Sequence, residues 1–179
     1  MKAGRNKTID LSVEEGKSYL DRCISISKPT DLQSVINKTI LGDTFSILPL
    51  LPTKFVDLLI ADPPYNLDKN FNGKKFKKTS DEMYEEYTES WIKSVLPLLK
   101  EDTTVYVCCD WQSSPIIGKV LKKYFYIQNR ITWQREKGRG ALSNWKNGME
   151  DIWFATVSKH YTFNVDKVKV RRKVIAPYK

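Results

Sequence analysis

The chain has 179 residues, of which 41% are hydrophobic and 28% are charged, a composition typical of a globular protein. It is long enough for one domain with a buried core, and its longest apolar run, 56–61, is interrupted by Asp57 and far too short to cross a bilayer. Its three cysteines match neither a disulfide framework nor a zinc motif. Because the start shows no signal-peptide pattern, we expect a reduced, cytoplasmic protein.

The formal net charge of +9 is concentrated in two segments. Residues 66–80 hold five lysines against one aspartate, and residues 166–179 hold six basic residues against one aspartate. Local basic clusters of this kind suit binding of a nucleic-acid phosphate backbone. Solvated, lysine-rich loops are the alternative interpretation.

The first half of the chain predicts helices followed by a buried strand. Ser12 and Glu15 have the spacing of a helix capping box, residues 31–37 predict a short turn, and residues 45–51 predict a short helix. Residues 55–61 form a nearly continuous apolar run that prolines stop, as in a buried strand of a parallel sheet.

The second half alternates helices and strands. Thr79 and Glu82 predict a capping box at the start of a long helix. Its core-facing residues recur at helical spacing: Tyr84, Tyr87, Trp91, Val95 and Leu98. A β-branched strand is expected over 103–109, and the next helix should begin with Ser114 as its N-cap and Pro115 at its first position.

Two further strands, 126–133 and 151–157, are expected to form an antiparallel hairpin at one edge of the sheet, joined by the polar segment 134–150. Within that segment we expect residues 138–140 to belong to a mobile loop near nucleic acid, because basic residues surround them. The alternation as a whole predicts an α/β sheet with flanking helices.

Asp62-Pro63-Pro64-Tyr65 follows the first strand and carries the strongest chemical signal. Ligands of open α/β sheets bind at the carboxyl ends of the strands. The two prolines fix a stiff turn without N–H donors. Asp62 and the carbonyl of Pro63 can each accept one N–H of a planar amine, while the ring of Tyr65 stacks on the heterocycle. A strand-ending turn with an incidental aspartate is the alternative.

These residues, with Asn66, resemble the catalytic motif of the amino-group DNA methyltransferases, which use S-adenosylmethionine. The resemblance extends from the lead-in Ile40-Leu41-Gly42-Asp43 to the end of the chain, and the motif order resembles the β group. It implies a Rossmann-like methyltransferase sheet with flanking helices, incomplete in this chain. Residues 1–37 would form an N-terminal helical arm, and residues 38–179 a partial catalytic domain.

The resemblance implies methyl transfer to DNA, as in DNA methylation and restriction-modification, and no metal. The target amine attacks the sulfonium methyl in line, and the base leaves the duplex to reach Tyr65. An aspartate at position 62 favours adenine N6 over cytosine N4. Asp43 and Asp62 are the expected cofactor contacts, although Asp43 could equally cap a turn or helix.

Double-stranded DNA is the expected substrate, and basic residues from both halves of the chain are candidates for binding it. They are Lys69, Lys74, Lys75, Lys77, Lys78, Arg135, Arg139, Arg171 and Arg172.

The family's glycine-rich F-x-G-x-G loop, which wraps the methionine part of the cofactor, is missing from this sequence. We therefore expect a second polypeptide, or a missing segment, to supply that loop and the target-recognition part. Such a half-sheet should leave its inner edge uncovered and a large hydrophobic face on this chain. A non-catalytic nucleic-acid-binding subunit with a relic motif and an RNA adenine methyltransferase are the alternatives.

Overall fold

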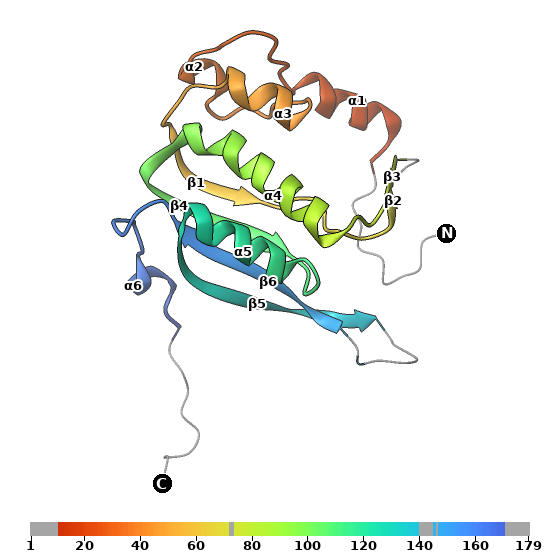
Figure 1. The fold of residues 1–179 in the computed structure, drawn as a ribbon. Coiled ribbons are helices and arrows are strands. Elements are labelled where there is room, and N and C mark those ends of the chain that lie inside the picture. The colour runs from red at the N-terminus through yellow and green to blue at the C-terminus, as the bar shows by residue number, and fades with distance from the viewer. Residues whose placement is uncertain (1–10, 72–73, 140–144, 146, 171–179) are drawn as a thin grey trace. The chain divides into compact units, whose positions relative to one another are not determined.

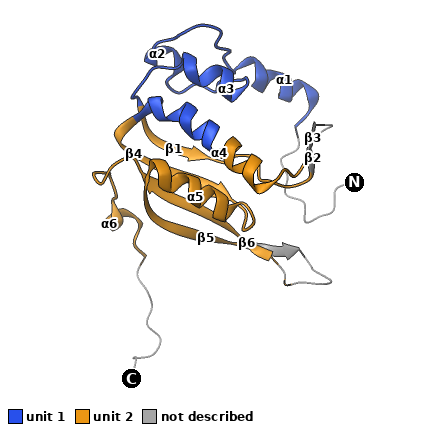
Figure 2. Ribbon diagram, viewed as in Figure 1, with its two compact units in different colours: residues 1–55, 89–99 blue, residues 56–88, 100–179 orange. Residues whose placement is uncertain are grey.

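The computed structural model describes residues 11–71, 74–139, 145 and 147–170, but not the side chains of 69–71, 74–76 and 135–139 (Figure 1). The chain divides into two compact units (Figure 2). Residues 1–55 and 89–99 form the first unit, and residues 56–88 and 100–179 form the second. The division at residue 37 stays a prediction.

Short capped helices make up the N-terminal part of the first unit: α1 (Val13–Asp21), α2 (Leu32–Val35), α3 (Thr44–Ile47) and the 3-10 turn η1 (Leu48–Leu50). The capping box at the start of α1 is confirmed, since Ser12 Oγ accepts from Glu15 N at 3.1 Å and Glu15 Oε2 accepts from Ser12 N at 2.8 Å. Asp31 caps α2 and Asp43 caps α3.

The second unit is built on a four-stranded sheet with the order β1-β4-β6-β5. The strands are β1 (Val56–Ala61), β4 (Leu99–Cys109), β5 (Tyr126–Arg139) and β6 (Asn147–Thr156). β6 runs antiparallel to both β4 and β5, which confirms the expected antiparallel hairpin. β1 and β4 run in the same direction, so the carboxyl ends of these two strands meet at one edge (Figure 1).

Strands β5 and β6 are longer than the sequence predicts. Gln134 pairs with Met149, and after a register irregularity Arg139 pairs with Asn147. The expected loop at 138–140 is therefore wrong for residues 138 and 139, whose backbone continues β5. Polar residues extend both strands because backbone pairing, rather than apolar alternation, determines where this hairpin ends.

Helix α4 (Asp81–Val95) continues into the 3-10 turn η2 (Leu96–Leu98), and its predicted core-facing residues Tyr84, Trp91, Val95 and Leu98 are buried. The predicted cap at Thr79 is wrong. Ser80 caps the helix, since its Oγ accepts from Met83 N at 3.3 Å. Thr79 instead donates two hydrogen bonds to Asn66 Oδ1, one from its amide and one from its hydroxyl.

Helix α5 (Ser114–Tyr124) packs on the sheet through Ile117, Val120 and Leu121, which lie at helical spacing and are fully buried. Its N-cap position is Ser113 rather than the predicted Ser114. The hydroxyl of Ser114 is used elsewhere, because it accepts a hydrogen bond from Trp153 Nε1 at 3.2 Å. On β4, the alternating residues Val105, Val107 and Cys109 complete the buried layer.

Two smaller elements complete the second unit. The antiparallel strands β2 (Lys69–Phe71) and β3 (Lys74–Phe76) form a hairpin that follows β1 and precedes α4 in the chain. The single-turn helix α6 (Val165–Val168) follows β6. Ahead of α6, Phe163 stacks on Phe154 of β6 with ring centroids 5.8 Å apart.

Candidate active site

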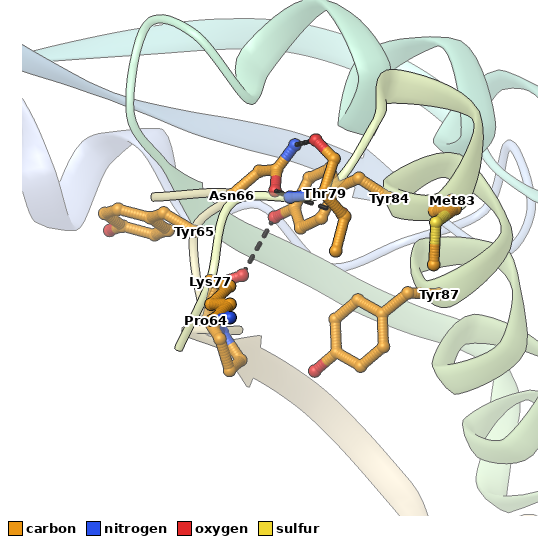
Figure 3. A pocket seen from close by; sticks show the side chains of 8 residues that line it. All are labelled: Pro64, Tyr65, Asn66, Lys77, Thr79, Met83, Tyr84 and Tyr87. Atoms are coloured by element: carbon orange, nitrogen blue, oxygen red, sulfur yellow. Dashed lines mark hydrogen bonds between the residues drawn. The ribbon is translucent and has the colours of Figure 1, made fainter. Parts of the chain in front are cut away.

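The turn Asp62–Tyr65 lies directly after β1, at the carboxyl end where the sequence places it. Asp62 and Pro64 are exposed, whereas Pro63 and Tyr65 are half-buried. A hydrogen bond from the Tyr84 hydroxyl of α4 to the carbonyl of Pro64, at 3.0 Å, ties the turn to the helix (Figure 3). The turn therefore has a fixed backbone, and the carboxylate of Asp62 remains accessible to a ligand.

Asp62 and Tyr65 act as a pair. Burial, the negative charge of Asp62 and a hydrogen bond to its carboxylate together raise the pKa of Tyr65 well above its ordinary value. The phenol of Tyr65 therefore stays protonated at neutral pH. A protonated phenol beside a carboxylate acts as a donor and fixes the orientation of both side chains.

Two groups from other strands lie close to this pair. Burial, followed by the charges of Asp62 and Glu150, raises the pKa of the Cys108 thiol at the end of β4. Glu150, near the start of β6, also contributes to the raised pKa of Tyr65. The sequence motif did not identify Glu150 as a site residue; its position just before a predicted strand was the available signal.

A cavity of about 260 Å³ lies next to the turn, on its α4 side (Figure 3). Most of its lining is apolar or aromatic, and Lys77 supplies a cation. The lining residues are Pro64, Tyr65, Asn66, Lys77, Thr79, Met83, Tyr84 and Tyr87. A concave, mostly apolar site with a few polar groups is typical of small-ligand and nucleobase binding.

The candidate DNA-binding residues fall into three groups. Lys77 and Lys78 are exposed at the base of the β2–β3 hairpin. Lys69, Lys74 and Lys75 lie on the strands of that hairpin, and Arg135 and Arg139 lie on β5, with side chains outside the described part. Arg171 and Arg172 lie outside the described residues altogether.

Asp43, a candidate cofactor contact, has a local role in the first unit. Its Oδ1 accepts hydrogen bonds from the amide and the hydroxyl of Ser46, each at 3.0 Å, and so caps α3. Its contact with a cofactor stays a prediction. Within the described ranges, no cluster of His, Cys, Asp or Glu side chains has the arrangement of a metal site, and each helix is too short or too polar to cross a membrane.

The family model described as DNA methylase, of the N6/N4 type, matches residues 56–174, which include the turn, the sheet and the hairpin. The chain belongs to the DNA methylase family. The predicted family is thus confirmed, and the match covers the whole sheet of the second unit.

Two curated relatives of the chain illustrate the similarity. The DNA adenine methyltransferase YhdJ of Escherichia coli (strain K12) is 30% identical over 148 residues, which are 82% of this chain and 50% of the relative. The type II methyltransferase M1.MboII of Moraxella bovis is 34% identical over 137 residues, which are 75% of this chain and 52% of the relative. The chain spans about half the length of the curated relatives it matches.

Solved structures confirm the predicted methyltransferase fold. The PvuII DNA methyltransferase, described as cytosine-N4-specific, superposes with a TM-score of 0.58 at 16% identity, over 80% of this chain and 54% of the other. TTHA0409 of Thermus thermophilus, a putative DNA modification methylase complexed with S-adenosyl-L-methionine, gives 0.53 at 16% identity, over 71% and 56%.

Proposed function

We propose that this chain is the catalytic-motif half of an S-adenosylmethionine-dependent DNA adenine-N6 methyltransferase. The observation that carries the proposal is the Asp62–Tyr65 turn at the carboxyl end of β1, with its carboxylate exposed and its phenol hydrogen-bonded to that carboxylate. Two adjacent acceptors and an aromatic face suit an exocyclic amine on a planar base.

In this proposal Asp62 and the carbonyl of Pro63 accept the two N–H groups of the target adenine, which keeps its lone pair directed at the methyl donor. The ring of Tyr65 stacks on the adenine, which has been rotated out of the duplex. The bond from Tyr84 holds the neighbouring carbonyl of Pro64, so the turn is already ordered before the base arrives. Positioning of this kind supplies much of the rate in a direct displacement.

S-adenosylmethionine would supply the activated methyl group, and the residues of this chain fit only part of its site. Asp62 and Asp43 are the candidate contacts that this chain would offer it. The sequence has no F-x-G-x-G loop to wrap the methionine part. We assign that part of the site to a complementary half of the enzyme.

The sheet supports the need for a complementary half. β1 is the last strand of the sheet within the described residues, and its apolar residues Leu58 and Ile60 are 52% and 66% exposed. Both side chains lie on one face of the strand, because residues two apart share a face. An exposed, apolar edge strand is a template for pairing with another segment. The half-length match to the relatives agrees with this interpretation.

The test combines this chain with the segment that carries the glycine-rich loop, which is sought in the DNA following the codon of Lys179. The complex is incubated with labelled S-adenosylmethionine and duplex DNA, and the methylated nucleoside is identified. We expect N6-methyladenine. N4-methylcytosine would contradict the adenine assignment, and methylation of structured RNA in preference to duplex DNA would favour the RNA alternative.

Asp62→Ala tests the role of the turn. Because Asp62 is exposed and accepts the substrate amine, the substitution should abolish methyl transfer while DNA affinity stays unchanged. Asp102→Ala, on the neighbouring strand β4, is the matched control, since Asp102 is also an exposed aspartate. DNA binding by the wild-type complex without any methyl transfer would instead support the relic, non-catalytic subunit.

A further inference from the structure

One buried side chain closes the base of the β2–β3 hairpin, which carries the lysines of residues 66–80 and is called the basic hairpin below. Asn66 is only 7% exposed. Its Nδ2 donates to the carbonyl of Thr79 at 3.0 Å, and its Oδ1 accepts from the amide of Thr79 at 2.8 Å and from the hydroxyl at 3.1 Å. Three hydrogen bonds thus join the residue before the hairpin to the residue after it.

The pairing continues outward from this base. Lys78 N donates to Asp68 Oδ1 at 2.9 Å, which forms a second rung next to Asn66 and Thr79. The β2–β3 ladder then pairs Lys69 with Phe76, and Phe71 with Lys74. The described residues of this segment therefore form a ladder anchored at Asn66, and the segment carries the first of the two basic clusters.

Asn66 also joins the hairpin to the sheet. Its amide donates to Ser113 Oγ at 3.3 Å, and Ser113 is 1% exposed. Ser113 N in turn donates to Asp110 Oδ1 at 2.9 Å, just beyond the end of β4. A buried polar network is costly unless its members find partners, and here the amide and both side-chain atoms of Asn66 do.

We propose that Asn66 is a positioning residue that couples the basic hairpin to the catalytic turn. It follows Tyr65 directly in the chain, so the same residue fixes the end of the turn and the base of the hairpin. A phosphate held by the hairpin is then held at a defined distance from Asp62. The consequence for DNA rests on the proposed function, whereas the mechanical coupling does not.

Limited trypsin digestion of the chain tests the coupling without DNA. Lys77 and Lys78 are exposed next to the base, and cleavage there requires the ladder to open. Asn66→Ala removes three hydrogen bonds at the base, so cleavage after these lysines should accelerate by about tenfold or more. Asn66→Asp keeps the Oδ1 acceptor for Thr79 but places a second oxygen against the carbonyl of Thr79, so cleavage should still be faster than in the wild type.

Asn129→Ala, an exposed asparagine on β5, is the matched control and should leave the digestion pattern unchanged. An unchanged cleavage rate at Lys77 and Lys78 in Asn66→Ala would overturn the proposal. So would an equal acceleration at every tryptic site with a lowered melting temperature, because that result indicates global unfolding.

Binding of duplex DNA by the complex with the complementary half gives the second readout. Asn66→Ala should weaken affinity several-fold at fixed salt, while the control variant binds as the wild type does. Faster cleavage with unchanged DNA affinity would contradict the functional coupling. If the wild-type chain does not bind duplex DNA even together with its complementary half, the proposed function fails, and the tryptic result still decides whether Asn66 anchors the hairpin.

Discussion

Gly118 on α5 is expected to tolerate no side chain. A Cβ added there would lie 2.4 Å from Trp153 Cζ2, 2.8 Å from Cη2 and 2.9 Å from Cε2. The indole is rigid, and its Nε1 donates to Ser114 Oγ at 3.2 Å, so the ring is held in place on β6. The substitution Gly118→Ala therefore forces either the helix or the ring to move.

Two opposing contributions determine the sign of the effect. Replacing glycine by alanine inside a helix stabilises it by about 1 kcal/mol. Overpacking a well-filled core costs about 1–3 kcal/mol. We expect the upper end of that range, because three atoms of a rigid ring are closer than any ordinary Cβ contact. Gly118→Ala should then lower the free energy of unfolding by about 2 kcal/mol.

Equilibrium unfolding in urea measures the change. Gly16→Ala on α1 is the matched control, since no atom lies within 4 Å of the added Cβ, and this variant should be as stable as the wild type or more so. Combining Gly118→Ala with Trp153→Phe should cost less than the sum of the single substitutions, because the smaller ring leaves space. A Gly118→Ala protein at least as stable as the wild type would refute the packing argument.

Two further predictions concern titratable groups. Burial raises the pKa of Cys109 to about 12, so Cys109 should react with a thiol reagent at neutral pH more slowly than the half-buried Cys23 and Cys108. Mass spectrometry of the labelled protein measures the order of reaction. Labelling of Cys109 before the other two cysteines would contradict this prediction. Hydrogen bonds from Lys119 and Lys123 lower the pKa of Glu85 in the folded state. The stabilisation by Glu85 is therefore present above its unfolded-state pKa and is lost as the pH falls through the lower folded-state pKa. Melting temperatures of wild type and Glu85→Gln should therefore differ slightly at pH 7 and converge in acid; a difference that grows in acid would reverse the sign.

The sequence predicts the helices and strands better than their ends. Thr79 and Ser114 both have the local pattern of an N-cap, yet neither caps its helix. Each hydroxyl instead bonds to a residue distant in sequence, Asn66 for Thr79 and Trp153 for Ser114. A spacing rule counts only local partners, so the competition with tertiary hydrogen bonds is invisible to it.

The residues of the candidate site likewise fall into a group that the sequence predicts and a group that it does not. Asp62 to Tyr65 are contiguous, and a short strand stopped by prolines identifies them directly. Glu150 and Ser113 reach the same region from β6 and from the loop before α5. Their contribution depends on the strand order and on antiparallel pairing, which place the start of β6 beside the end of β4. Only the folded sheet brings these residues to the turn.

The edge of β1 provides the sharpest test of the half-enzyme proposal. Ile60 is 66% exposed, so Ile60→Lys should change the free energy of unfolding of this chain by no more than about 0.5 kcal/mol. If a complementary half pairs along β1, it would bury Ile60. A lysine at this position would then carry an unpaired charge into an apolar interface. We therefore expect unchanged thermal unfolding of the isolated variant and loss of co-purification with the complementary half. Glu101→Lys, an exposed change on β4, is the control for added charge. Normal assembly by the Ile60→Lys chain would show that β1 is not the docking edge.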